Sequence, residues 1–164
     1  MMMNEWRFTV LKKKMLFGLL TAVFLLVVNA ASAFAAPPAP IHIEVLEYPG
    51  GTGAPAEPFT ASGPAVDAGW VCATGTVEDV DLAYNDPTGA YQMIWALKRF
   101  DCGDGTFDVN LVVRLDLITH NTTARWRIVD GSGAYAGLRG QGSLVGTSEE
   151  PGVSIRDVYD GLVH

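Results

Sequence analysis

The chain has 164 residues, of which 49% are hydrophobic and 18% are charged, and this composition is typical of a globular protein. Acidic residues outnumber basic residues 18 to 11, so the formal net charge is −7. Because binding to a phosphate backbone needs clustered Lys and Arg, the composition argues against a nucleic-acid partner.

Residues 1–35 have the three parts of a secretory signal peptide. The basic residues Arg7 and Lys12 to Lys14 precede an apolar stretch from Met15 to Val28. As a helix this stretch would be about 21 Å long, which is short for a bilayer core of roughly 30 Å. Small residues then predict cleavage near Ala33 or Ala35. We expect a secreted or extracytoplasmic protein with no stable membrane anchor, and the alternative is an uncleaved anchor.

Cleavage would leave 129 residues, enough for one domain, with 7 basic and 17 acidic residues and a formal charge of −10. Both cysteines, Cys72 and Cys102, lie in this part, and an even number in an exported chain predicts a disulfide. Closing a loop of about 31 residues would stabilise the fold by roughly 3 to 4 kcal/mol on the chain-entropy model. The alternative is a metal site or a catalytic thiol, but the histidines show no ligand spacing. We expect no metal site and no cofactor.

Residues 36–40 form a Pro-rich lead that is expected to lack regular structure. From residue 41 to 48 apolar and polar residues alternate with a period of two, which predicts a half-buried strand. Residues 49–58 are rich in Gly and Pro and predict a loop. Further strands are predicted at 59–62, within 69–82, and at 91–102.

The clearest alternation covers residues 106–116, where one face carries Phe107, Val109, Leu111, Val113 and Leu115. The preceding Asp104-Gly105 predicts a tight hairpin turn. The last predicted strands cover residues 124–129, 142–147 and 154–163. Seven or eight short antiparallel strands predict an all-β domain over residues 41–164, either an eight-stranded antiparallel β-barrel or a β-sandwich. We prefer the barrel because closure protects strand edges.

Residues 130–146 carry six glycines and include a relaxed dinucleotide fingerprint, Gly131 to Ala136. That fingerprint needs a long helix after the loop, and the glycines that follow would each cost a helix about 1 kcal/mol. We therefore expect the glycines to supply positive φ angles for a turn-rich crossover. One helical turn is expected over 134–138, with Tyr135 and Leu138 plugging an end of the core.

Short sequence motifs spread over residues 59–164 resemble those of a known family. They are the run from Val129 to Gly142, Gly69-Trp70-Val71-Cys72 with Gly75-Thr76-Val77, the Cys102 hairpin with Asp104-Gly105, and Asp157-Val158-Tyr159 with Gly161 and His164. The glycine run resembles that of the allene oxide cyclase and dirigent barrels, and the whole pattern is similar to a group of uncharacterised secreted bacterial proteins. The resemblance implies an eight-stranded barrel with an apolar lumen. In the named enzymes the lumen holds an oxylipin or a phenolic radical, and carboxylates and an Arg inside the barrel position it.

Three functions follow as hypotheses, of which we prefer binding of a small apolar or aromatic ligand in the lumen. Candidate contacts are Tyr91, Met93, Trp95 and Trp126, and the alternative is that these side chains simply fill a narrow barrel. The second hypothesis is an isomerase or cyclase of the allene oxide cyclase type, for which no catalytic residue is assigned. Its candidate polar groups at a barrel mouth are Arg99, Asp101, Arg125, Arg127 and Asp160. The third is a non-catalytic interaction module of the cell envelope. No residue pattern specifies an oligomeric state.

Overall fold

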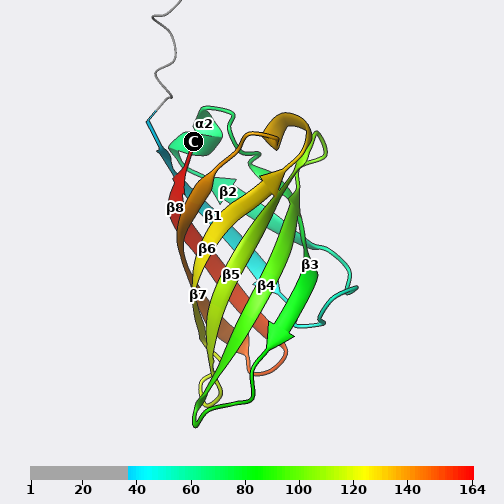
Figure 1. Ribbon diagram of the computed structural model, residues 1–164, viewed down its shortest axis with the longest axis vertical. Helices are drawn as coiled ribbons and strands as arrows, with labels where there is room; N and C mark the ends of the chain where they lie inside the picture. Colours follow the sequence, from blue (N-terminus) through cyan, green and yellow to red (C-terminus); the bar gives the residue numbers. More distant parts are fainter. Residues whose placement is uncertain (1–36) are drawn as a thin grey trace, which may run out of the picture. The chain divides into compact units, whose positions relative to one another are not determined.

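The computed structural model describes residues 37–164, and the predicted signal peptide lies outside the described residues. The described chain forms a closed barrel of antiparallel strands in which each strand pairs with its neighbours in sequence and the last pairs with the first (Figure 1). The strands are β1 (Ala39–Glu47), β2 (Glu57–Ser62), β3 (Thr74–Tyr84), β4 (Tyr91–Asp101), β5 (Thr106–Asp116), β6 (Thr122–Gly131), β7 (Gly140–Glu150) and β8 (Ser154–Val163). The predicted eight-stranded barrel is confirmed, and the sandwich is not formed.

Strand β1 begins inside the predicted Pro-rich lead, because Ala39 and Pro40 already pair with Val163 and Leu162 of β8. The expectation of irregular structure is therefore wrong for these two residues. Proline is tolerated here because β2 pairs with β1 only from His42 onward. Pro40 thus has one neighbouring strand, and its missing N–H breaks no ladder on the other side.

The alternation predicted for strand β5 is confirmed. Phe107, Val109 and Leu111 point into the barrel and are at most 2% exposed. The ring of Phe100 stacks on that of Phe107 with 4.9 Å between centroids, and the edge of Tyr159 meets Phe100 at 5.7 Å. These side chains form a continuous core inside one half of the barrel, since all are buried in the same hydrophobic cluster.

Two short helices close one end of the barrel, α2 (Pro64–Asp67) and the 3-10 helix η1 (Gly133–Tyr135). Figure 1 shows α2 at the end opposite the long β3–β4 hairpin. Ala65 of α2 is fully buried, and Tyr135 and Leu138 are buried as predicted for a plug. Within residues 37–164, no helix has the length and hydropathy needed to cross a membrane.

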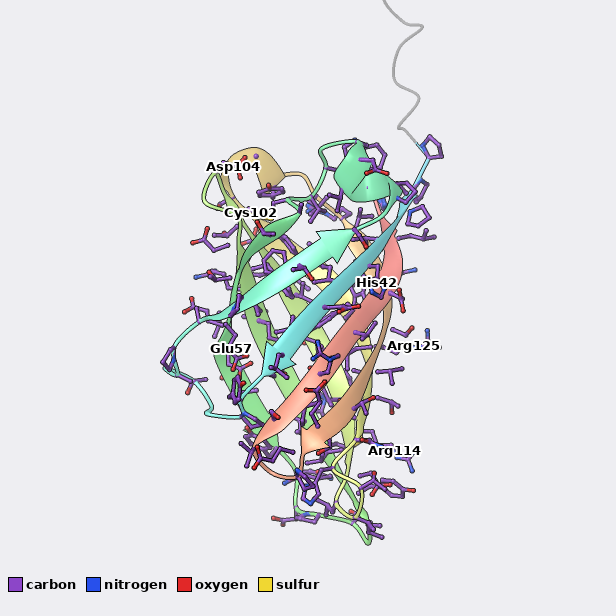
Figure 2. The ribbon with its side chains drawn as sticks, turned by 180° about the vertical axis from the view of Figure 1, so that it is seen from behind. His42, Glu57, Cys102, Asp104, Arg114 and Arg125 are labelled. Atoms are coloured by element: carbon purple, nitrogen blue, oxygen red, sulfur yellow. A yellow bond between two sulfur atoms is a disulfide. The ribbon has the colours of Figure 1, made fainter. Side chains whose placement is uncertain are left out.

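The predicted disulfide is confirmed, and it joins Cys72 to Cys102 with 5.9 Å between their Cα atoms. It ties the segment between α2 and β3 to the residue after β4. Figure 2 shows Cys102 and Asp104 at the same end of the barrel. Because such a bond persists in oxidising compartments, it indicates an extracytoplasmic environment.

The positive φ angles expected in the glycine run are confirmed at one position only. Between residues 131 and 146 only Gly133 has a positive φ, of 56°. Gly142 of β7 instead pairs with Trp126 of β6 on one side and with Gly161 of β8 on the other. A Cβ at either glycine would overlap the indole ring of Trp126. The two glycines therefore make room for a tryptophan inside the barrel.

Candidate functional site

The lumen is filled near its closed end and open at the other end. The space beside Trp126 has a volume of about 10 Å³, which is the volume of a single water site at most. At the opposite end, where β1 and β3 end and β8 begins, the lumen opens into a pocket of about 210 Å³. Its apolar lining residues are Leu82, Ile94, Ala96, Leu111, Val113, Leu115 and Ile155.

Lys98 enters this pocket from strand β4, between the inward residues Ala96 and Phe100. Its side chain is only 7% exposed. The ammonium donates a hydrogen bond of 2.7 Å to Oδ1 of Asp79 and another to Oε1 of Glu47. A buried cation needs such partners, because the desolvation penalty of an unpaired ammonium is several kcal/mol.

Asp157 of strand β8 is the third carboxylate in the pocket, and it is 5% exposed. The hydroxyl of Thr122 donates a hydrogen bond of 3.3 Å to its Oδ1. Gly146 of β7 pairs directly with both residues, and a Cβ at this position would overlap both oxygens. The glycine thus creates the space in which Thr122 and Asp157 meet.

Burial shifts the pKa values of this cluster toward neutrality. Desolvation raises the pKa of Asp79 to about 6, and the neighbouring charge of Asp157 adds to the shift. Desolvation likewise raises the pKa of Asp157 to about 6, although Lys98 and Thr122 oppose the shift. The pKa of Lys98 is lowered to about 8 by desolvation, against the attraction of Asp157. Groups with such values can exchange protons near pH 7, as in many binding and catalytic sites.

Three carboxylates therefore surround one ammonium in a pocket with apolar walls. Above pH 7 Asp79 and Asp157 are largely ionised, so these two carboxylates outnumber the single ammonium. Among residues 37–164, no group of three or more His, Cys, Asp or Glu side chains is placed to hold a metal ion. The arrangement can bind a polar group of an organic molecule and move a proton to or from it.

The predicted contacts on strand β4 point the wrong way. Tyr91 and Trp95 are 39% and 45% exposed, and Trp95 pairs with the outward-facing Val112. Met93 has the same orientation, because alternate residues of a strand share a face. The guanidinium of Arg114 lies 3.5 Å from the ring centroid of Tyr91, and Figure 2 shows Arg114 projecting from the barrel. These three residues do not face the lumen, whereas Trp126 faces its filled half.

The five polar residues considered for the barrel mouth lie on the outer face. Arg99 forms a two-pronged ion pair with Asp108 on β5, with distances of 2.7 and 2.8 Å. Asp160 accepts a hydrogen bond of 2.8 Å from Nδ1 of His42. Asp101 accepts one from the backbone N–H of Gly103, at 2.7 Å. Arg99 and Asp160 thus pair across neighbouring strands on the outer surface, as the alternative of cross-strand pairing predicts.

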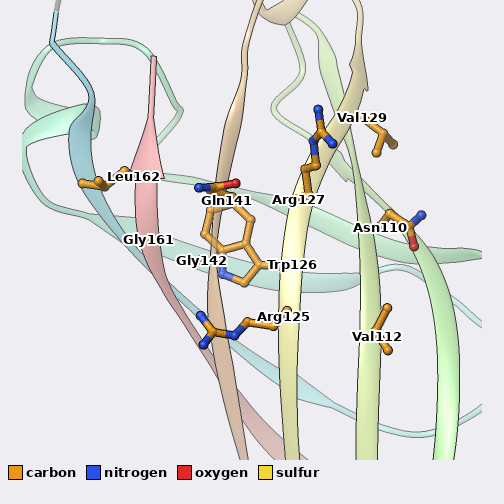
Figure 3. A pocket seen from close by; sticks show the side chains of 10 residues that line it. All are labelled: Asn110, Val112, Arg125, Trp126, Arg127, Val129, Gln141, Gly142, Gly161 and Leu162. Atoms are coloured by element: carbon orange, nitrogen blue, oxygen red, sulfur yellow. The ribbon is translucent and has the colours of Figure 1, made fainter.

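Arg125 and Arg127 flank a wide outer depression of about 680 Å³ over strands β5 to β8 (Figure 3). Gly142, Gly161 and the edge of Trp126 are among its lining residues. The depression is larger than the lumen pocket, but it is more open to solvent and its charged side chains are exposed. The lumen pocket is the better candidate site because it combines enclosure with buried charge.

Sequence reasoning missed Lys98, Glu47, Asp79 and Asp157. One signal could have identified Lys98, since it is the only lysine after residue 14 and it alternates with the apolar Ala96 and Phe100. A charged residue on the apolar face of a strand is a candidate site residue. The carboxylates gave no such signal, because acidic residues are common throughout this chain.

No protein-family model matches the chain, and a search of curated proteins found no match. Its function therefore has to be inferred from the pocket and its charges.

Proposed function

We propose that this protein is a secreted barrel that binds a small apolar or aromatic molecule in the open half of its lumen. The observation that carries the proposal is the pocket of about 210 Å³, whose apolar walls surround the buried Lys98 and its carboxylates. Secretion is supported by the basic and apolar segments of residues 1–35 and by the disulfide between Cys72 and Cys102. The resemblance to lumen-binding barrels supports the same location for the ligand.

The volume of the pocket limits the ligand to a small molecule. A cavity of about 150 Å³ is known to hold benzene, whereas drug-sized ligands occupy roughly 300 to 1,000 Å³. A pocket of about 210 Å³ therefore fits one ring with a short substituent. A long-chain oxylipin would extend out of the mouth past Tyr84, which is 55% exposed.

Stability alone does not account for the buried charges. Replacing a buried ion pair by apolar residues of similar volume is often neutral or stabilising by about 1 to 4 kcal/mol. A polar cluster kept at the wall of an open cavity is what a binding site requires, because a few polar groups orient the ligand.

Native mass spectrometry of the protein isolated from its natural source tests this proposal. We expect a noncovalent adduct of low mass that is released by denaturation. In a second test, Ala96→Leu should fill the pocket and abolish binding of benzyl alcohol, while Val112→Leu on the outer face should not. Absence of an adduct, together with equal binding by both variants, would refute the proposal.

Isomerase or cyclase activity is the second candidate function, and one observation favours it. Asp157 and Lys98 lie in the same enclosed pocket and titrate near neutral pH, at about 6 and about 8. Such a pair can act as a general acid and a general base. Loss of turnover in Asp157→Asn without loss of ligand binding would support catalysis over simple binding.

A further inference from the structure

We propose that the lumen pocket selects a cationic ligand, namely a single ring or short alkyl chain that carries an ammonium group, and that Asp157 binds the ammonium. This inference rests on the proposed function, because it names the chemical class of the ligand that the open lumen would hold. It is carried by the balance of charge in the pocket and by the hydrogen bonds that its charged groups make.

The charge balance of the pocket favours a cation. Lys98 is the one positive side chain among the pocket's lining residues, against the carboxylates of Glu47, Asp79 and Asp157. Other titratable groups that face the cluster are acids as well. Glu57 on β2 is one of these, because desolvation raises its pKa and the charges of Asp79 and Asp157 add to the shift. A cationic ligand would neutralise part of this excess, whereas an anion would increase it.

The hydrogen bonds show which carboxylate is left to bind the ligand. Both hydrogen bonds of the Lys98 ammonium go to Glu47 and Asp79. Asp157 receives one side-chain hydrogen bond, from Thr122 at a long 3.3 Å. A carboxylate can accept several hydrogen bonds, and a charge-assisted bond from an ammonium would be the strongest of these.

The apolar walls suit the rest of such a ligand. Leu111 of β5 is fully buried, and Ile94 and Ala96 of β4 line the same pocket. Tyr84 stands at the mouth and presents an aromatic ring. The pocket thus offers a carboxylate to the charge and an apolar surface to the ring.

Calorimetric titration with benzylamine, benzyl alcohol and benzoate tests this inference, because the three probes have similar size and different charge. We expect benzylamine to bind at least about tenfold more tightly than benzyl alcohol, and benzoate to bind most weakly. Asp157→Asn should remove this preference and leave benzyl alcohol unaffected. Asp81→Asn, on the outer face of the same strand as Asp79, is the control and should change neither affinity.

The pH dependence of benzylamine binding to the unmodified protein gives a second test that does not need a variant to fold. Because the pKa of Asp157 is about 6, affinity should fall about tenfold between pH 8 and pH 5, while that of benzyl alcohol stays constant. Equal binding of benzylamine and benzyl alcohol, or tightest binding of benzoate, would overturn the inference and leave the proposed function intact. Failure of all three probes to bind, together with the absence of an adduct in native mass spectrometry, would overturn both.

Discussion

The ammonium of Lys98 lies 2.7 Å from Oδ1 of Asp79, inside a barrel whose other half is filled by a hydrophobic cluster. Both residues point into the lumen from neighbouring strands, since Lys98 and Asp79 are directly paired across β4 and β3. The pair stands at the boundary between the filled and open halves of the lumen. A change in either residue should therefore alter both the stability of the barrel and the charge of the pocket.

Lys98→Met should destabilise the protein in a pH-dependent manner. The variant leaves Glu47, Asp79 and Asp157 without their cation, and breaking a buried pair costs about 3 to 5 kcal/mol. The loss should be largest at pH 8 and smaller at pH 5, where the carboxylates can bind protons. Urea denaturation at both pH values measures it.

Arg156→Met is the matched control, because Arg156 pairs with Glu149 on the surface and both side chains are more than 40% exposed. The free energy of unfolding of this variant should fall by less than about 1 kcal/mol. Equal losses for the two variants, or a loss for Lys98→Met that is the same at both pH values, would contradict the account.

The stability of the protein should fall as the pH rises from 4 to 7, relative to the Asp157→Asn variant. The pKa of Asp157 is about 6 in the folded state and near 3.8 when unfolded, so the folded state binds the proton more tightly. Its stabilising contribution is complete below pH 3.8 and is lost as the pH rises through 6. We expect a difference on the order of 2 kcal/mol between the ends of this range. Thermal unfolding at four pH values measures it, and parallel curves for the two proteins would refute it.

Gly161→Ala should destabilise the barrel by about 1 to 3 kcal/mol, because the new methyl group would overlap the indole of Trp126. Gly137→Ala is the control, since a Cβ there meets no atom within 4 Å and its φ is not positive. We expect that variant to change stability by less than about 1 kcal/mol. Chemical denaturation of both proteins measures the effect, and equal stabilities would show that Trp126 can move aside.

Reduction of the disulfide should lower the free energy of unfolding by about 3 to 4 kcal/mol, because Cys72 and Cys102 close a loop between positions 30 residues apart. Denaturation with and without a reductant measures this loss. Mass spectrometry should show the oxidised chain to be lighter than the reduced chain by two hydrogen atoms. An unchanged unfolding midpoint after complete reduction would contradict the prediction.

Much of the fold could be predicted from the sequence, because strand β5 alternates cleanly between apolar and polar residues. The orientation of β4 could not, since this strand has apolar residues on both faces. Ile94, Ala96 and Phe100 point inward, while Met93 and Trp95 point outward. The alternation of β4 is therefore ambiguous, and only its pairing with β5 fixes which face is buried.

The pocket was beyond sequence reasoning for a different reason. Glu47, Asp79 and Asp157 lie far apart in the chain and meet only because β8 pairs with β1 to close the barrel. Strand β3 also has an irregularity between Asp79 and Asp81, which puts Asp79 and Leu82 on the same face. Such a bulge has no clear sequence signature. Strict alternation would therefore assign the residues on one side of the bulge to the wrong face of the strand.

The NMR signal of Lys98 tests the central claim most directly, because Lys98 is the only lysine after residue 14 and selective ¹³C-lysine labelling isolates it within the barrel. Benzylamine should shift the Lys98 side-chain resonance in a saturable manner, at the concentrations at which calorimetry detects binding. Ala96→Leu should abolish the shift. A Lys98 resonance that stays in place up to the solubility limits of benzylamine and benzyl alcohol would show that the open half of the lumen is not a ligand site.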